Sequence, residues 1–386
     1  MKHIRPKAIF KNILLSITAI LLFVVTAEML CRIWFNPAED LFLGLFEYDK
    51  DKIYALKRNI ADGQFVGKKV TTNSFGYRDT EIPVAKGNRH RVLVVGDSVT
   101  FGHGVEAEQA YPEVLESMLN SDPKCQFDVI NTAVPGNSPF QEYYDLKRGL
   151  IFKPDIVIIQ FVLNDLIEPY KIFMRYGGIG IDYHGIVDFP YWHYFLARRS
   201  AFYGCFHKII VKAKFGAFDK ASLKKKVIQM ERELSWNAAS DKPASPRLQE
   251  AWKECFIWLQ KEVDLCRQEG IDCFLLISFD DFQLLNPDRR YAQEAVERFC
   301  VENSIHCINF LAYVEEEALK QVAGKYRLSK NTTFKDILLA YPEDVRRIYN
   351  DYFLDYGHYS AKGHYFAAGI LLPLIQQLGL CEGAGR

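Results

Sequence analysis

The chain has 386 residues, of which 49% are hydrophobic, 14% aromatic and 25% charged, a composition that excludes disorder for most of its length. Its 48 lysine and arginine residues balance 48 aspartate and glutamate residues, so the formal net charge is zero and a nucleic-acid-binding protein is not expected. The length fits either two domains of about 150 residues or one elaborated α/β domain.

An apolar segment lies close to the N-terminus. No charged residue occurs between Lys11 and Glu28, and four basic residues with no acidic one lead into this segment: Lys2, Arg5, Lys7 and Lys11. By the positive-inside rule, this pattern predicts a cytoplasmic tail at 1–11, a single transmembrane helix at 12–35 and an extracytoplasmic remainder, periplasmic or on the cell surface. A cleaved signal peptide is the main alternative, because Val25-Thr-Ala27 resembles a cleavage site. A buried core helix is the remaining alternative.

The segment 36–89 has a mixed pattern, with turn signals in Asn-Ser-Phe-Gly-Tyr-Arg-Asp at 73–79. We expect it to be a lead-in that packs on the domain that follows at 90–386. In that domain, apolar strands predicted at 91–95, 127–130, 155–161, 273–278 and 305–310 alternate with helical patterns. Such alternation indicates a parallel sheet with helices on both faces, so the predicted fold class is α/β. Loops that begin at Gly96, Thr132 and Val162 should converge at the carboxyl ends of the strands.

An aromatic and basic stretch at about 170–245 interrupts this alternation, and we interpret it as an insertion. Aromatic residues at 191–195 precede a group of lysines: Lys208, Lys212, Lys214, Lys220, Lys224, Lys225 and Lys226. The simpler interpretation is a helical cap with a solvated lysine face. The alternative is an interfacial helix or lid near lipid headgroups or an acidic polymer.

The chain has nine cysteines, an odd number that leaves at least one thiol unpaired or paired with another chain after export. No Cys-x-x-Cys pair occurs, so a zinc or redox motif is not indicated. Two Cys-x6-Cys intervals, 266/273 and 300/307, each span a predicted helix-to-strand turn. We expect these residues to be small buried hydrophobic side chains, with disulfides as the alternative.

Ser98 directly follows an apolar strand, in Gly96-Asp-Ser-Val-Thr-Phe-Gly102, where a helix should begin. A backbone N–H at that position points into the crevice, and the helix dipole favours developing negative charge. This placement suits a nucleophile. The alternative is an ordinary helix N-cap serine.

Asp355 and His358 stand three residues apart near the C-terminus, in Asp355-Tyr-Gly-His358. A carboxylate at this spacing can hold an imidazole in one tautomer, as the general base for a serine requires. The pair alone is a weak signal because such spacings also occur by chance. The nearby His364 is either a structural histidine or a surface residue, and His103 is expected to be a loop residue rather than a second base.

Asn164 and Gly136 follow two other strands and provide an amide side chain and an unhindered backbone N–H. Acyl transfer needs such donors around the carbonyl oxygen as it becomes an oxyanion, and each donor lowers the activation barrier by about 3 kcal/mol. Together with Ser98, Asp355 and His358, they form a far more specific pattern than any one of them.

Four sequence blocks, around Ser98, Gly136, Asn164 and Asp355-x-x-His358, resemble those of the SGNH (GDSL-type) hydrolases, including membrane-anchored bacterial members. The resemblance covers roughly residues 90 to 380. The resemblance implies a flavodoxin-like α/β/α fold with about five parallel strands. It implies that Ser98 is the nucleophile, His358 the base and Asp355 its orienting partner. The N–H groups of Ser98 and Gly136 and the amide of Asn164 would form the oxyanion hole. Val162 departs from the family pattern, which has glycine there.

We therefore expect a membrane-anchored serine esterase with an acyl-Ser98 intermediate and no metal or diffusible cofactor, acting on an acyl ester, with acetylated carbohydrate favoured. The alternatives are an O-acyltransferase on a polysaccharide, a lipid-ester hydrolase, and a catalytically silent glycan-binding module.

Overall fold

The computed structural model describes residues 6–34, 45–49, 51–122, 125–166, 175–176, 179–180, 196, 199–206, 236–240 and 246–381. The chain divides into two compact units, one formed by Met1–Gly44 and Lys171–Gln229, the other by Leu45–Tyr170 and Met230–Arg386. Most of the aromatic and basic insertion predicted at about 170–245, including its lysine group, lies outside the described residues.

The first unit contains helix α1 (Pro6–Trp34), and its part Phe10–Trp34 is long and apolar enough to cross a membrane, with a mean hydropathy of 2.4. Its large apolar side chains are exposed, as expected for a membrane span or a signal sequence and not for a buried core helix. Near its end, the Glu28 carboxylate accepts hydrogen bonds from the Ser200 hydroxyl (2.7 Å) and from the backbone N–H of Phe202 (3.0 Å). Helix α1 therefore contacts the segment around residue 200.

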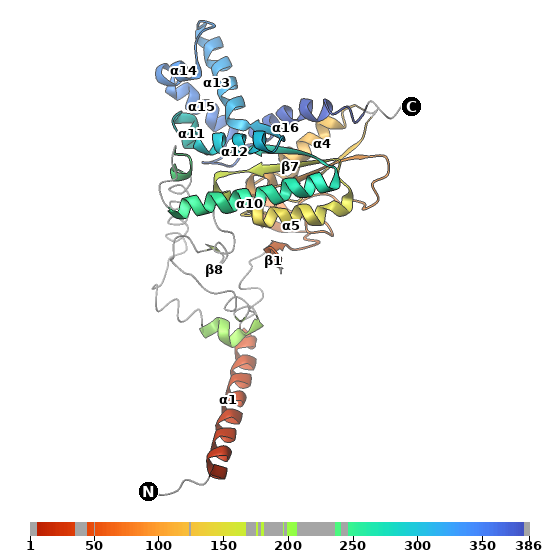
Figure 1. Cartoon of the computed structure of the whole chain (residues 1–386), viewed down its shortest axis with the longest axis vertical. Helices are drawn as coiled ribbons and strands as arrows, with labels where there is room; N and C mark the ends of the chain where they lie inside the picture. The colour runs from red at the N-terminus through yellow and green to blue at the C-terminus, as the bar shows by residue number, and fades with distance from the viewer. Residues whose placement is uncertain are drawn as a thin grey trace. The chain divides into compact units, whose positions relative to one another are not determined.

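The second unit is built on a five-stranded parallel sheet (Figure 1). The strands lie in the order β11 (His306–Asn309), β10 (Asp272–Ile277), β7 (Ile156–Phe161), β5 (His90–Val95), β6 (Phe127–Asn131). Taken in chain order, this is the 2-1-3-4-5 arrangement of flavodoxin-like folds. The predicted α/β fold with about five parallel strands is confirmed.

Helices cover both faces of the sheet because successive side chains of a strand point to opposite sides. Val92 and Val94 belong to one hydrophobic cluster, whereas Leu93 and Val95 belong to the other. The first cluster includes residues of α4 (Tyr111–Leu119), α11 (Asp281–Leu285), α13 (Phe310–Tyr326), α14 (Phe334–Ala340), α15 (Pro342–Tyr352) and α16 (Ala361–Gln376). The second includes residues of α5 (Pro139–Gly149), α10 (Pro246–Glu269) and α12 (Tyr291–Glu302). Figure 1 shows α5 and α10 on one side of the sheet and α4 and α16 on the other.

Residues before the first strand of the sheet pack on the same unit. They form two short hairpins, β1 (Phe46–Asp49) with β2 (Ile53–Leu56) and β3 (Gly63–Phe65) with β4 (Lys68–Val70). Buried Arg78 donates hydrogen bonds to the carbonyl oxygens of Phe101 (2.9 Å), Gly102 (2.8 Å) and Val105 (2.9 Å). The segment predicted as a lead-in therefore stabilises the loop at 101–105, which follows Ser98.

A disulfide joins Cys125 to Cys381, which are 256 residues apart in sequence. The other seven cysteines form no disulfide. Of the four in the two regular intervals, Cys266, Cys273 and Cys300 are buried as expected, whereas Cys307 is half-buried. The disulfide joins the segment just before β6 to the segment that follows α16.

Candidate active site

Ser98 begins the four-residue helix α3 (Ser98–Phe101), immediately beyond the end of β5. The N-cap of this helix is Asp97, whose Oδ1 accepts a hydrogen bond from the N–H of Val99 at 2.8 Å. Ser98 is thus not the N-cap serine of the alternative interpretation. Its Oγ lies 2.9 Å from Nε2 of His358.

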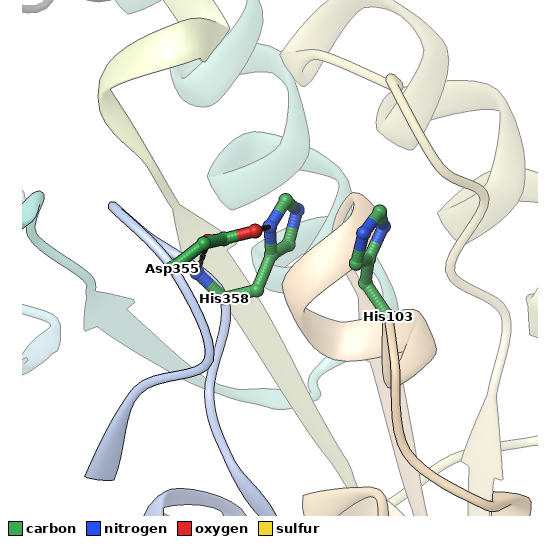
Figure 2. A group of neighbouring side chains, drawn as sticks. All are labelled: His103, Asp355 and His358. Atoms are coloured by element: carbon green, nitrogen blue, oxygen red, sulfur yellow. Dashed lines mark hydrogen bonds and ion pairs between the residues drawn. The ribbon is translucent and has the colours of Figure 1, made fainter. Parts of the chain in front are cut away.

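His358 is held between Ser98 and Asp355. Its Nδ1 lies 2.8 Å from Oδ2 and 2.9 Å from Oδ1 of Asp355, and its backbone N–H donates to the same carboxylate at 2.9 Å (Figure 2). The loop that carries Asp355 and His358 is closed by a hydrogen bond from the N–H of Leu354 to the carbonyl of His358, at 2.8 Å. Asp355, His358 and the distant Ser98, 260 residues earlier in the sequence, therefore form one line of hydrogen bonds.

Asp355 is ionised in this arrangement. Burial raises its pKa, but the hydrogen bond and charge of His358 outweigh burial and hold the pKa below its usual range. An ionised carboxylate only accepts hydrogen bonds, so Nδ1 of His358 must carry the proton. In the neutral ring this leaves Nε2 as an acceptor that faces the Ser98 hydroxyl.

Asn164 lies beside the serine, in the 3₁₀ turn η3 (Leu163–Leu166) after β7. Its Nδ2 donates to Oδ2 of Asp97 at 2.9 Å, and the same oxygen accepts from Ser98 Oγ at 3.2 Å. The neighbouring Val162, where the family pattern has glycine, donates its N–H to Oδ2 of Asp165 at 2.8 Å. The Asp165 side chain thus closes the turn that carries Asn164.

Gly136 lies in the loop between β6 and α5 and has a φ of 79°, a conformation that glycine adopts without steric cost. In the same loop, the N–H of Val134 donates to the carbonyl of Gly96 at 3.3 Å. The Gly136 loop therefore runs beside the loop that carries Asp97 and Ser98.

Two residues that the motifs did not assign contribute to this cluster. Asp97 is buried and joins Ser98, Val99 and Asn164, and its only sequence signal is an acidic residue directly before the serine. The ring of His103 stacks on the ring of His358, with centroids 3.7 Å apart and planes inclined by 10° (Figure 2). His103 lies in a turn, as expected for a loop residue, but its stacking on His358 was not predicted.

His364 is a structural histidine, which settles one alternative left open by the sequence. The ring is fully buried, and its Nδ1 accepts a hydrogen bond from the backbone N–H of Tyr111 at 3.1 Å. The pKa of His364 is lowered to about 3, mainly by burial and to a smaller extent by the nearby His358. The ring is therefore neutral at neutral pH.

Within the part of the chain that the structure describes, one group of side chains has metal-ligand atoms within 4.8 Å of one another: His103, Asp355 and His358. An imidazole nitrogen coordinates a metal in the plane of its ring. The two rings lie in nearly parallel planes, 10° apart, so a single ion cannot lie in both. The stacked arrangement does not fit a metal centre.

Comparison with known proteins gives matches in sequence and in structure. No family model matches the chain. A stretch of 93 residues is 32% identical to an acetylxylan esterase of Xylanibacter ruminicola, covering 22% of this chain and 18% of that relative. The chain thus spans less than a fifth of the length of the curated relative that it matches.

Three solved structures are a lipase/acylhydrolase from Enterococcus faecalis, a catalytic mutant of an acetylxylan esterase from Geobacillus stearothermophilus, and a GDSL-like lipase from Bacteroides thetaiotaomicron. Their sequence identities are 13%, 16% and 10%, and their TM-scores are 0.37, 0.36 and 0.34. They cover 75%, 75% and 78% of this chain and 96%, 95% and 93% of their own. The chain resembles the SGNH (GDSL-type) hydrolases, as its sequence motifs predicted.

Proposed function

We propose that the protein is a serine esterase that cleaves acyl esters through an acyl-Ser98 intermediate. The observation that carries the proposal is the line of hydrogen bonds from Asp355 through His358 to Ser98 Oγ. As Oγ attacks the ester carbonyl, Nε2 of His358 takes its proton and then delivers it to the departing alkoxide. Water, deprotonated by the same nitrogen, releases the acyl group in the second half of the reaction.

The oxyanion of each tetrahedral intermediate would be stabilised by the N–H groups of Ser98 and Gly136 and by the amide of Asn164. An amide nitrogen carries two hydrogens, and the bond from Asn164 to Asp97 uses one of them while it fixes the orientation of the group. The second hydrogen is the one offered to the oxyanion. Preorganised donors of this kind contribute about 3 kcal/mol each to transition-state stabilisation.

The proposed substrate is an acetyl ester of a carbohydrate. The matched curated relative is named an acetylxylan esterase, and the same name applies to one of the similar structures. We expect the full-length protein in detergent to release acetate from acetylated xylo-oligosaccharides and to hydrolyse p-nitrophenyl acetate much faster than p-nitrophenyl decanoate. The measurement is kcat/KM for the three substrates, with Ser98→Ala as the blank. A preference for decanoate would instead indicate a lipid ester.

We further propose that helix α1 anchors the chain and that the second unit lies outside the cytoplasm. The basic residues before the apolar segment support this topology by the positive-inside rule, and the disulfide between Cys125 and Cys381 supports it because disulfides persist in oxidising compartments. The contact of Phe23 with Phe202, at 6.1 Å between ring centroids, supports retention of the helix, since cleavage after Ala27 would remove it.

Counting thiols tests the topology. Cells that express the full chain, quenched in acid and alkylated under denaturing conditions without reductant, should give seven adducts per chain, because seven of the nine cysteines form no disulfide. A matched chain that lacks residues 1–35 loses Cys31 and should remain in the cytoplasm, where all of its other cysteines react. Full-length chain that reacts at all nine cysteines would contradict export. A shortened, soluble product of the full-length gene would indicate a cleaved signal peptide.

A further inference from the structure

We propose that His103 is a positioning residue for the catalytic base, one that holds the face of the His358 ring and makes its protonation sensitive to a second imidazole. The inference rests on the proposed esterase function. Ser98 and Asp355 contact the ring of His358 at its two nitrogens, at 2.9 and 2.8 Å. A ring held at those two points can still tilt about the line that joins them. A flat group against its face prevents that tilt.

His103 is such a group. Its ring lies nearly parallel to that of His358, 3.7 Å away, and Figure 2 shows the two rings face to face. The ring of His103 also meets Phe65 edge-on, at 5.4 Å between centroids and 86° between planes. Phe65 in turn packs on buried Phe101. The stack is thus supported from the lead-in segment.

The backbone around His103 is built to present the ring. Gly102 and Gly104 both have positive φ angles, 85° and 77°. The His103 N–H donates to the carbonyl of Ser98 at 2.9 Å, and a Cβ added to Gly104 would lie 2.7 Å from Cδ1 of Leu354. The loop therefore packs directly on the segment that carries Asp355 and His358.

Charge distinguishes an imidazole from other flat rings in this position. Two protonated imidazoles 3.7 Å apart repel each other, so the charge of one ring disfavours protonation of the other. Groups near the pair include the Asp355 carboxylate, the Tyr356 ring at 6.1 Å from His358, the neutral His364, and Arg78 on the carbonyl of Gly102. Among these neighbours, His103 is the ionisable ring in direct face-to-face contact with the proposed base.

Two substitutions separate the effect of the ring from the effect of the charge. His103→Ala removes the stack, and we expect kcat on p-nitrophenyl acetate to fall by about tenfold to a hundredfold with little change in KM, as expected for a misplaced catalytic group. His103→Phe keeps a flat ring without a charge. Its plateau kcat should remain close to that of the wild type, while the acidic limb of its pH–rate profile moves to higher pH by about one unit, because repulsion is removed.

The control is His306→Ala, which removes a histidine that stacks on Phe274 at 4.9 Å and lies outside the site. It should leave kcat and the pH profile unchanged. Wild-type activity that depends on Ser98 establishes the esterase function independently of His103. Given that activity, wild-type kcat and pH profile in His103→Ala would overturn the positioning role alone. If His103→Ala fails to fold, His103→Phe decides: a shifted acidic limb supports the proposal, and an unshifted limb overturns it.

Discussion

The Ser98→Ala variant is expected to lose hydrolysis of p-nitrophenyl acetate by at least about 1,000-fold in kcat, because no other group can take the place of the attacking oxygen. The loss should be accompanied by loss of covalent labelling. A fluorophosphonate probe forms a stable bond with an activated serine, so it should modify the wild type and fail to modify Ser98→Ala. Mass analysis of the labelled peptide should place the adduct on Ser98.

A matched control distinguishes loss of the nucleophile from general damage. Ser121→Ala removes a hydroxyl that donates to the carbonyl of Met118 at the surface, and it should retain both activity and labelling. Ser98 is buried beside a packed loop, so the melting temperature of Ser98→Ala should be measured as well. Equal labelling of wild type and Ser98→Ala would refute the assignment of the nucleophile.

The sheet could be predicted because its central strands contain runs of apolar residues, such as Val92–Val95 in β5 and Ile156–Ile159 in β7. Every residue of β7 is buried, and so is every residue of β5 except the first, since helices cover both faces of a parallel sheet. That burial leaves a continuous run of β-branched and aliphatic residues in the sequence. Periodicity alone cannot specify the order of the strands, which depends on how the connections cross the sheet.

The residues proposed for catalysis could be proposed from sequence because each directly follows a strand or lies in a compact motif. Ser98, after β5, and His358, in the loop between α15 and α16, are 260 residues apart, and the tertiary structure brings them within hydrogen-bonding distance. The stacking of His103 and the bonds of Asp97 have no such signal, since both depend on the exact path of two loops. The same holds for Arg78, whose contacts are with backbone carbonyls rather than with a recognisable partner side chain.

The disulfide illustrates a different limit. Nine cysteines allow many pairings, and no spacing in the sequence marks Cys125 and Cys381 as the joined pair. These two residues meet because α4, which leads to Cys125, packs against α16, which leads to Cys381. Helix packing of this kind is decided by the tertiary structure and leaves no local pattern.

Asp355→Asn is expected to lower kcat/KM by about 10³- to 10⁴-fold while leaving the fold intact, because the substitution changes one atom of the side chain but reverses its hydrogen-bonding capacity. The carboxylate only accepts, which keeps the proton of His358 on Nδ1 and leaves Nε2 open toward Ser98. An amide can also donate to Nδ1, which allows the tautomer with a proton on Nε2. That tautomer cannot take the proton of the serine. The imidazolium formed during attack also loses its negative neighbour.

The pH dependence provides a second test of Asp355. Burial raises its pKa, but the hydrogen bond and charge of His358 prevail, so the folded protein holds this carboxyl group below its usual pKa. A depressed carboxyl pKa stabilises the fold above the unfolded pKa of about 3.9, and this stabilisation disappears as pH falls through the folded value. Relative to the wild type, Asp355→Asn should therefore melt lower at pH 7, and the difference should shrink below about pH 4.

The matched control is Asp351→Asn, which removes a surface carboxylate paired with Lys362 at 2.8 Å, four residues before Asp355 in the same segment. Because exposed ion pairs contribute little to stability, this variant should show wild-type kcat/KM and a melting temperature close to that of the wild type. If Asp355→Asn retained kcat/KM within about tenfold of the wild type, the carboxylate would not be what orients His358. The base would then be held by its stack on His103 and its bond to Ser98, which makes the double variant Asp355→Asn/His103→Ala the decisive comparison.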